Sequence, residues 1–103
     1  MGFFNFNKTI QLRVHAERVG IGLCQINNEL RKHQSATPLI EGLCIAVSDE
    51  MQKMYTIADQ LSTDDRFTIS LSYNGKMILY NDFMREIEFF RKMLLTDYNI
   101  QLF

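Results

Sequence analysis

Apolar side chains recur along two consecutive stretches of the chain at alternating steps of four and three residues. In the first stretch they are Leu12, Ala16, Val19, Leu23, Ile26 and Leu30. In the second they are Ile40, Cys44, Val47, Met51, Met54, Ala58 and Leu61. This spacing keeps the apolar side chains on one face of an α-helix. Because the connection around residues 34–37 is short, we expect two long antiparallel helices.

The first helix is predicted over residues 8–33. Ile10, Leu12 and Val14 also alternate as a strand would, but Leu12 continues the helical phase of the residues that follow. Gly20 and Gly22 each cost a helix about 1 kcal/mol relative to Ala. Either small residues let the two helices approach closely (Ala16 and Gly20 on the first, Gly42 and Ala46 on the second), or the helix breaks near Gly20.

The second helix is predicted to run from Pro38 to about Leu61. Thr37 can accept a hydrogen bond as the N-cap, and Pro38 suits the first helical position because it has no N–H to satisfy. Ser48, followed by two acidic residues, could begin a new helix, so a break is an alternative there. Residues 62–65 are predicted to end the helix as a polar loop.

A β-hairpin is predicted over residues 66–80. Apolar and polar side chains alternate from Phe67 to Tyr73, and Asn74-Gly75 is the pair that a two-residue type I′ turn favours. Such a turn pairs Tyr73 with Lys76 and Leu71 with Ile78. The face expected to pack on the helices comprises Phe67, Ile69, Leu71, Ile78 and Tyr80.

A third helix is predicted over residues 82–95, capped by Asn81 or Asp82. The tail, residues 100–103, alternates weakly, which allows a short final strand. The sequence thus predicts one α+β domain, residues 1–103, with two long antiparallel helices, a hairpin and a third helix.

Composition excludes several classes of protein. Hydrophobic residues make up 47% and charged residues 22% of the 103 residues, which is typical of a globular domain and too apolar for disorder. The longest uncharged apolar run, residues 42–47, is far too short to span a membrane. The N-terminus does not resemble a secretory signal, and Cys24 and Cys44 lie on or beside the apolar stripes. We therefore expect reduced thiols and a cytoplasmic protein without a membrane partner.

Charge divides the two predicted helices. Residues 1–36 carry five Lys or Arg against two Glu, whereas residues 37–65 carry one Lys against six Asp or Glu. Mutual compensation between docked helices explains this division, and a basic face for a polyanion is the alternative.

No residue pattern indicates catalysis or a cofactor. The candidate metal ligands His15, His33, Cys24 and Cys44 match no ligand spacing, so neither a metal site nor a cofactor is expected. No combination of nucleophile, base and orienting group is evident, and we expect a protein that is not an enzyme.

The order of helices, hairpin and further helix is similar to that of a winged-helix DNA-binding regulator, in which the hairpin is the wing. This resemblance implies that Arg66 and Lys76, the cations nearest the wing, contact DNA. The segment that would supply the recognition helix, residues 37–62, is acidic with Lys53 as its only cation, which disfavours nucleic acid because phosphate contacts supply much of the affinity.

Association with a protein partner fits the composition best. Three phenylalanines near the N-terminus and several Phe and Met residues of the third helix exceed what one small core needs. The predicted partner-binding residues are Phe3, Phe4, Phe6, Met84, Phe89 and Met93. We expect a homodimer or a partner groove, in an inhibitor or accessory factor of phage or mobile-element origin. A small ligand between the helices is the remaining alternative.

Overall fold

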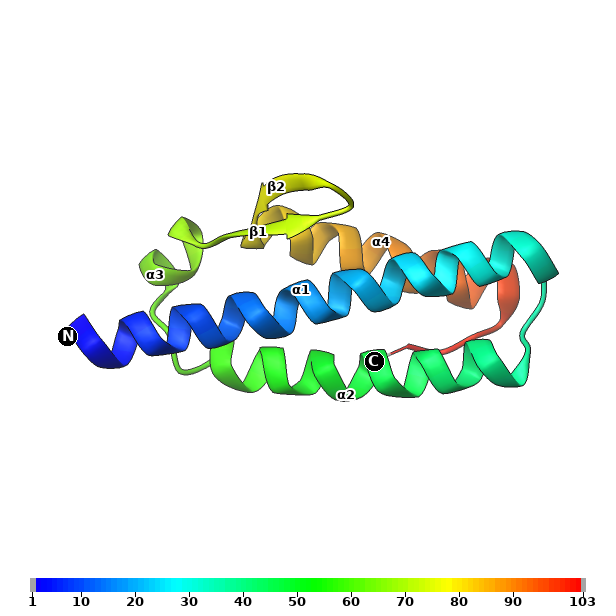
Figure 1. The fold of residues 1–103 in the computed structure, drawn as a ribbon, viewed down its shortest axis with the longest axis horizontal. Coiled ribbons are helices and arrows are strands. Elements are labelled where there is room, and N and C mark those ends of the chain that lie inside the picture. The colour runs from blue at the N-terminus through cyan, green and yellow to red at the C-terminus, as the bar shows by residue number, and fades with distance from the viewer. Residues whose placement is uncertain (1, 103) are drawn as a thin grey trace.

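A computed structural model describes the backbone of residues 2–102 and the side chains of residues 7–102. The chain forms an α+β fold with the predicted pair of long helices, hairpin and further long helix (Figure 1). Its elements in order are α1 (Gly2–His33), α2 (Pro38–Ala58), α3 (Thr63–Thr68), β1 (Ser70–Tyr73), β2 (Lys76–Leu79) and α4 (Tyr80–Tyr98).

The longest helix, α1, sets the length of the molecule. Its 32 residues at about 1.5 Å each match the longest dimension of 47 Å. The helix begins at Gly2, before the predicted start at residue 8, so Phe3, Phe4 and Phe6 belong to it. The side chains of these three residues lie outside those described. It does not break at Gly20, and the strand alternative for residues 10–14 is wrong.

α2 returns antiparallel to α1 after a short connection. Gln34 takes a left-handed conformation (φ 57°), and its N–H donates to the carbonyl of Leu30, which closes the end of α1. The hydroxyl of Thr37 accepts from the N–H of Ile40 at 3.3 Å, as predicted for the N-cap. The helix continues through Ser48 without a break.

The two apolar stripes form most of the core. All thirteen predicted stripe residues are buried, none more than 6% exposed. α4 crosses the α1–α2 pair on one side and adds Phe83, Ile87 and Leu94 to the same cluster. The heptad-like spacing therefore identified the core of both helices correctly.

The predicted glycine packing is only partly correct. A side chain at Gly22 would meet Cγ2 of Val47, so this glycine permits the close approach of α1 and α2. Gly20 instead faces the ring of Tyr73 on the hairpin, whereas Gly42 faces open space and Ala46 is exposed.

Residues 63–68 form a helix, where a polar loop and the start of the hairpin were predicted. The Ser62 hydroxyl accepts from the N–H of Asp65 at 3.1 Å, and two acidic residues occupy the first turn, where they favour the helix dipole. Because residues 63–68 are helical, the first strand begins only after Ile69. Phe67 consequently lies on α3 and is exposed instead of packing under the hairpin.

The hairpin is therefore shorter than predicted, but its turn and register are confirmed. Asn74 and Gly75 both have positive φ, as a type I′ turn requires. Tyr73 pairs with Lys76 and Leu71 with Ile78. The N–H of Tyr80 also donates to the carbonyl of Ile69, which continues the predicted register by one more pair.

α4 is longer than predicted at both ends. It begins at Tyr80 directly after β2, and Leu79 is its N-cap without a side-chain hydrogen bond, so neither Asn81 nor Asp82 caps it. It ends at Tyr98, and its C-cap Asn99 takes the left-handed conformation. Residues 99–102 form no strand; Ile100 and Leu102 instead bury their side chains against the helices.

Candidate functional site

Two polar side chains of α1 hold the hairpin along the helix. The Nε of Arg13 donates to the carbonyl of Ser70 at 2.9 Å, and the N–H of Ser72 donates to Oε2 of Glu17 at 2.8 Å. Both backbone groups lie on the edge of β1 that β2 does not pair. The contacts satisfy an edge that would otherwise be open, and they fix the hairpin on one side of α1.

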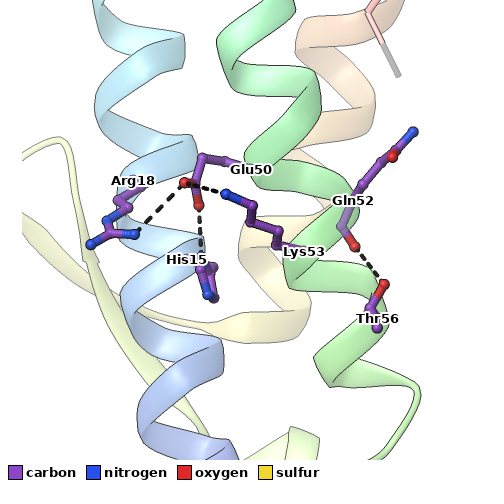
Figure 2. Close-up of polar contacts among 6 residues, drawn as sticks. All are labelled: His15, Arg18, Glu50, Gln52, Lys53 and Thr56. Carbon is purple, nitrogen blue, oxygen red and sulfur yellow. Dashed lines mark hydrogen bonds and ion pairs between the residues drawn. The ribbon is translucent and has the colours of Figure 1, made fainter.

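A polar cluster joins α1 to α2 on the other side. A carboxylate oxygen of Glu50, on α2, lies 2.7 Å from Nδ1 of His15 (Figure 2). The other oxygen lies 3.7 Å from the guanidinium of Arg18 and 3.8 Å from the ammonium of Lys53. His15 and Arg18 come from α1, so the cluster ties the basic helix to the acidic one. This is the compensation that the charge pattern predicted.

The environment lowers the pKa of Glu50 below its ordinary value of 4.5. Burial opposes ionisation of this carboxyl, but the hydrogen bond from His15 and the charges of His15, Lys53 and Arg18 together outweigh the burial. The carboxylate is therefore ionised at neutral pH and holds the cluster together.

Between the hairpin and α2, the outward face of α1 carries exposed aliphatic side chains. Ile10, Val14 and Ile21 have exposed fractions of 41%, 40% and 61%. Together with Glu17 they occupy consecutive steps of four, three and four residues, which place them on one stripe opposite the core stripe. We call these three aliphatic residues the outer stripe.

Hollows flank the outer stripe at Ile21. One of about 430 Å³ separates Ile21 from the hairpin turn and includes Tyr73 and Asn74 in its lining. The other, of about 180 Å³, separates Ile21 from Leu43 and Val47 of α2. Ile21 therefore stands as a ridge with a groove on each side, a shape that can interdigitate with the side chains of another helix.

The sequence did not identify the outer stripe as a surface. The alternation of Ile10, Leu12 and Val14 did contain this information, but it was considered only as evidence for a strand. On a helix the same alternation places Leu12 in the core and its two neighbours on the opposite face.

The predicted partner-binding residues of α4 do not form one patch. Phe89 is the most exposed, at 71%. Met84 and Met93 are half-buried and pack against the core. Met93 lies one turn after Phe89, whereas helical spacing places Met84 on the other flank of α4.

The structure separates the two predicted DNA contacts. Arg66 belongs to α3, where it lies 3.4 Å from the hydroxyl of Thr63 and is half-buried. Lys76 is exposed after the turn at the far end of β1. Neither α1 nor α2 breaks, and the short helix α3 lies between α2 and the hairpin.

The candidate metal ligands do not converge. Among the residues that the structure describes, no three His, Cys, Asp or Glu side chains lie close enough together to hold a metal ion. Cys24 and Cys44 are free thiols, and burial, followed by the charge of Glu41, raises the pKa of Cys44. His33 lies 3.6 Å from Glu29 at the end of α1, on the same helix. Within residues 2–102 no helix has the length and apolar character needed to cross a membrane.

Comparison with models of protein families, with curated proteins and with solved structures finds no match to this chain.

Proposed function

We propose that this chain is a non-enzymatic protein-interaction module that binds another helix through the outward face of α1. The observation that carries the proposal is the outer stripe: three aliphatic side chains lie 40–61% exposed on one face of the longest helix, away from the core. A second copy of the chain is the partner that we propose, because it presents the same stripe and a two-fold dimer uses one patch on both subunits.

The spacing of the stripe supports a helical partner. Steps of four and three residues are those of a helix–helix seam, in which each side chain enters a gap between side chains of the facing helix. Glu17 occupies the fourth position of the seam, where its carboxylate is already bonded to the backbone of Ser72. A polar residue at one seam position lowers the affinity and restricts the alignment of the partner helix.

The energetics favour reversible association. Full burial of an aliphatic side chain contributes about 1.5–3 kcal/mol, and the outer stripe is already half-buried in the free chain. Association of two proteins costs about 4–15 kcal/mol in lost freedom, so the stripe supports a dimer that depends on concentration.

Light scattering over a concentration series tests this proposal with two matched variants. Ile21→Glu places a charge in the outer stripe, and Phe89→Glu makes the same kind of change on α4, the surface that the sequence favoured. Both side chains are more than 60% exposed, so neither change should alter the fold, and circular dichroism checks this. We expect the unchanged chain and Phe89→Glu to dimerise, and Ile21→Glu to remain monomeric.

Other outcomes would contradict the proposal. Loss of the dimer in Phe89→Glu alone would assign the interface to α4, and a chain that is monomeric at every concentration would refute the homodimer. The same measurement with random duplex DNA at low salt tests the DNA-binding alternative: a complex that salt dissociates steeply would favour a regulator.

A further inference from the structure

A groove of about 420 Å³ lies between α2 and the segment that follows α4. Ile45, Ser48 and Gln52 line it from α2, and Asn99, Ile100 and Gln101 line it from the C-terminal segment. Its volume falls within the range of about 300–1,000 Å³ that binding clefts occupy. Its floor is apolar, and its walls offer three side-chain amides that can pair with a peptide backbone.

The charge of the groove has one sign. Glu41 and Asp49 both line it from α2, and its lining contains no Lys, Arg or His. Neither carboxylate forms an ion pair with any residue among those described. Lys53, one turn beyond Asp49, directs its ammonium group to Glu50 instead (Figure 2). Within the described part of the chain, the groove therefore presents two carboxylates that take part in no ion pair.

Spacing along α2 specifies the shape of a complementary ligand. Glu41, Ile45 and Asp49 follow one another at steps of four residues, which is about 6 Å per step along a helix. An extended peptide advances about 6.6 Å for every two residues, and alternate side chains point to the same side. A peptide with the order basic, any, aliphatic, any, basic therefore matches the acidic, aliphatic, acidic order of the groove in both charge and distance.

We propose that this groove binds an extended segment of a partner protein in which two basic residues flank an aliphatic residue at alternate positions. The aliphatic side chain packs against Ile45 and Ile100, and the two cations pair with Glu41 and Asp49. The side-chain amides of Gln52, Asn99 and Gln101 hydrogen-bond the backbone of the segment. The groove shares no lining residue with the outer stripe, so peptide binding at this site can be tested independently of the dimer.

The probe for this site is the blocked peptide Lys-Ser-Leu-Ser-Lys, titrated into the nitrogen-15-labelled full chain and followed by NMR. The side-chain amide signals of Gln52, Asn99 and Gln101 report occupancy directly. We expect these signals to move with this peptide. They should move far less with its isomer Lys-Lys-Leu-Ser-Ser, which has the same composition and charge but the wrong spacing, and not at all with Glu-Ser-Leu-Ser-Glu.

Charge reversal separates the site from general attraction. Asp49→Lys should weaken binding of Lys-Ser-Leu-Ser-Lys about tenfold, because one cation then faces a like charge. Ile45→Gln should weaken it without a change of charge. Asp82→Lys, an equal charge change at an exposed position of α4, should leave it unaltered.

Equal shifts with the isomeric peptide would overturn the proposal, because the spacing would then be irrelevant. Equal weakening by Asp49→Lys and Asp82→Lys would overturn it as well, by showing attraction to net charge alone. Absence of shifts at the three amides, or the same shifts with spermine, would exclude the peptide site.

Discussion

Gly22 shows how a single residue decides the distance between the two long helices. In an exposed helix, glycine costs about 1 kcal/mol relative to alanine, and this cost needs compensation. Close packing of the two helices offsets this cost, because Val47 of α2 occupies the space that a side chain at Gly22 would take. Gly42 of α2 has no such neighbour within 4 Å.

Gly22→Ala and Gly42→Ala should therefore change stability in opposite directions. The first should lower the free energy of unfolding by about 1–3 kcal/mol, because Val47 or the helix must move. The second should raise it by about 0.5–1 kcal/mol, because alanine is the better helix former and meets open space. Urea unfolding measures both. Partial recovery in the double variant Gly22→Ala/Val47→Ala would confirm the contact, and equal effects of the two single changes would refute it.

Glu50 links stability to pH. Its pKa is lower in the folded chain than its ordinary value of 4.5, so the folded state favours the ionised form. The stabilisation is therefore fully present above about pH 4.5 and is lost as the pH falls through the lower, folded pKa. Neutral pH lies on the stabilised side.

Glu50→Gln should destabilise the chain at pH 7 by about 1–2 kcal/mol, and should flatten the loss of stability below pH 4.5. Urea midpoints from pH 7 to pH 3 measure this dependence. Asp82→Asn is the control, because the Arg85–Asp82 pair is exposed on both sides and should contribute little. If both variants keep the acid profile of the unchanged chain, the cluster around Glu50 does not stabilise the fold.

At the scale of elements, apolar periodicity predicted the buried faces, and local capping decided the boundaries. Both long helices, the Asn74-Gly75 turn and the hairpin register follow from patterns of several residues that agree with one another. The predicted boundaries are wrong where two short sequence patterns favour different structures for the same residues. Ser62 and the acidic residues after it form α3 within what the alternation predicted as loop and strand, and α4 begins at Tyr80 before the expected cap.

The hairpin depends on a contact that the sequence could not reveal. Glu17 is 55 positions from Ser72, and no local pattern joins them. The two-stranded sheet is small, and such a hairpin is at best marginally stable without further packing. Its attachment to α1 through Arg13 and Glu17 is therefore part of what keeps it formed.

Glu17→Ala should loosen the hairpin without unfolding the helices. The N–H of Ser72 is exposed and loses its acceptor to water, at a cost of about 0.5–1.5 kcal/mol that falls mainly on local opening of the hairpin. Hydrogen exchange measured by NMR should show faster exchange at Ser72, with little change in the amides of α2. Glu29→Ala on the same helix is the control. Unchanged protection of Ser72 would show that packing alone holds the hairpin.

At the scale of the whole molecule, α1 has two faces with different roles. One face carries the stripe that packs into the core, and the other carries the outer stripe along an elongated body of 47 × 23 × 19 Å. The core stripe was predictable because burial imposes a regular period. The outer stripe was not, because exposed aliphatic residues indicate a binding surface only when the positions of the hairpin and α2 show that neither of them covers these side chains.

We propose that the outward face of α1 binds a second copy of the chain. A dilution series of the isoleucine-methyl-labelled protein, followed by NMR, tests it most directly, because Ile10 and Ile21 report on this face while Ile45 reports on another exposed surface. We expect the methyl signals of Ile10 and Ile21 to move with concentration and the signal of Ile45 to stay constant. Constant signals at Ile10 and Ile21 while the mass of a dimer is measured would contradict it.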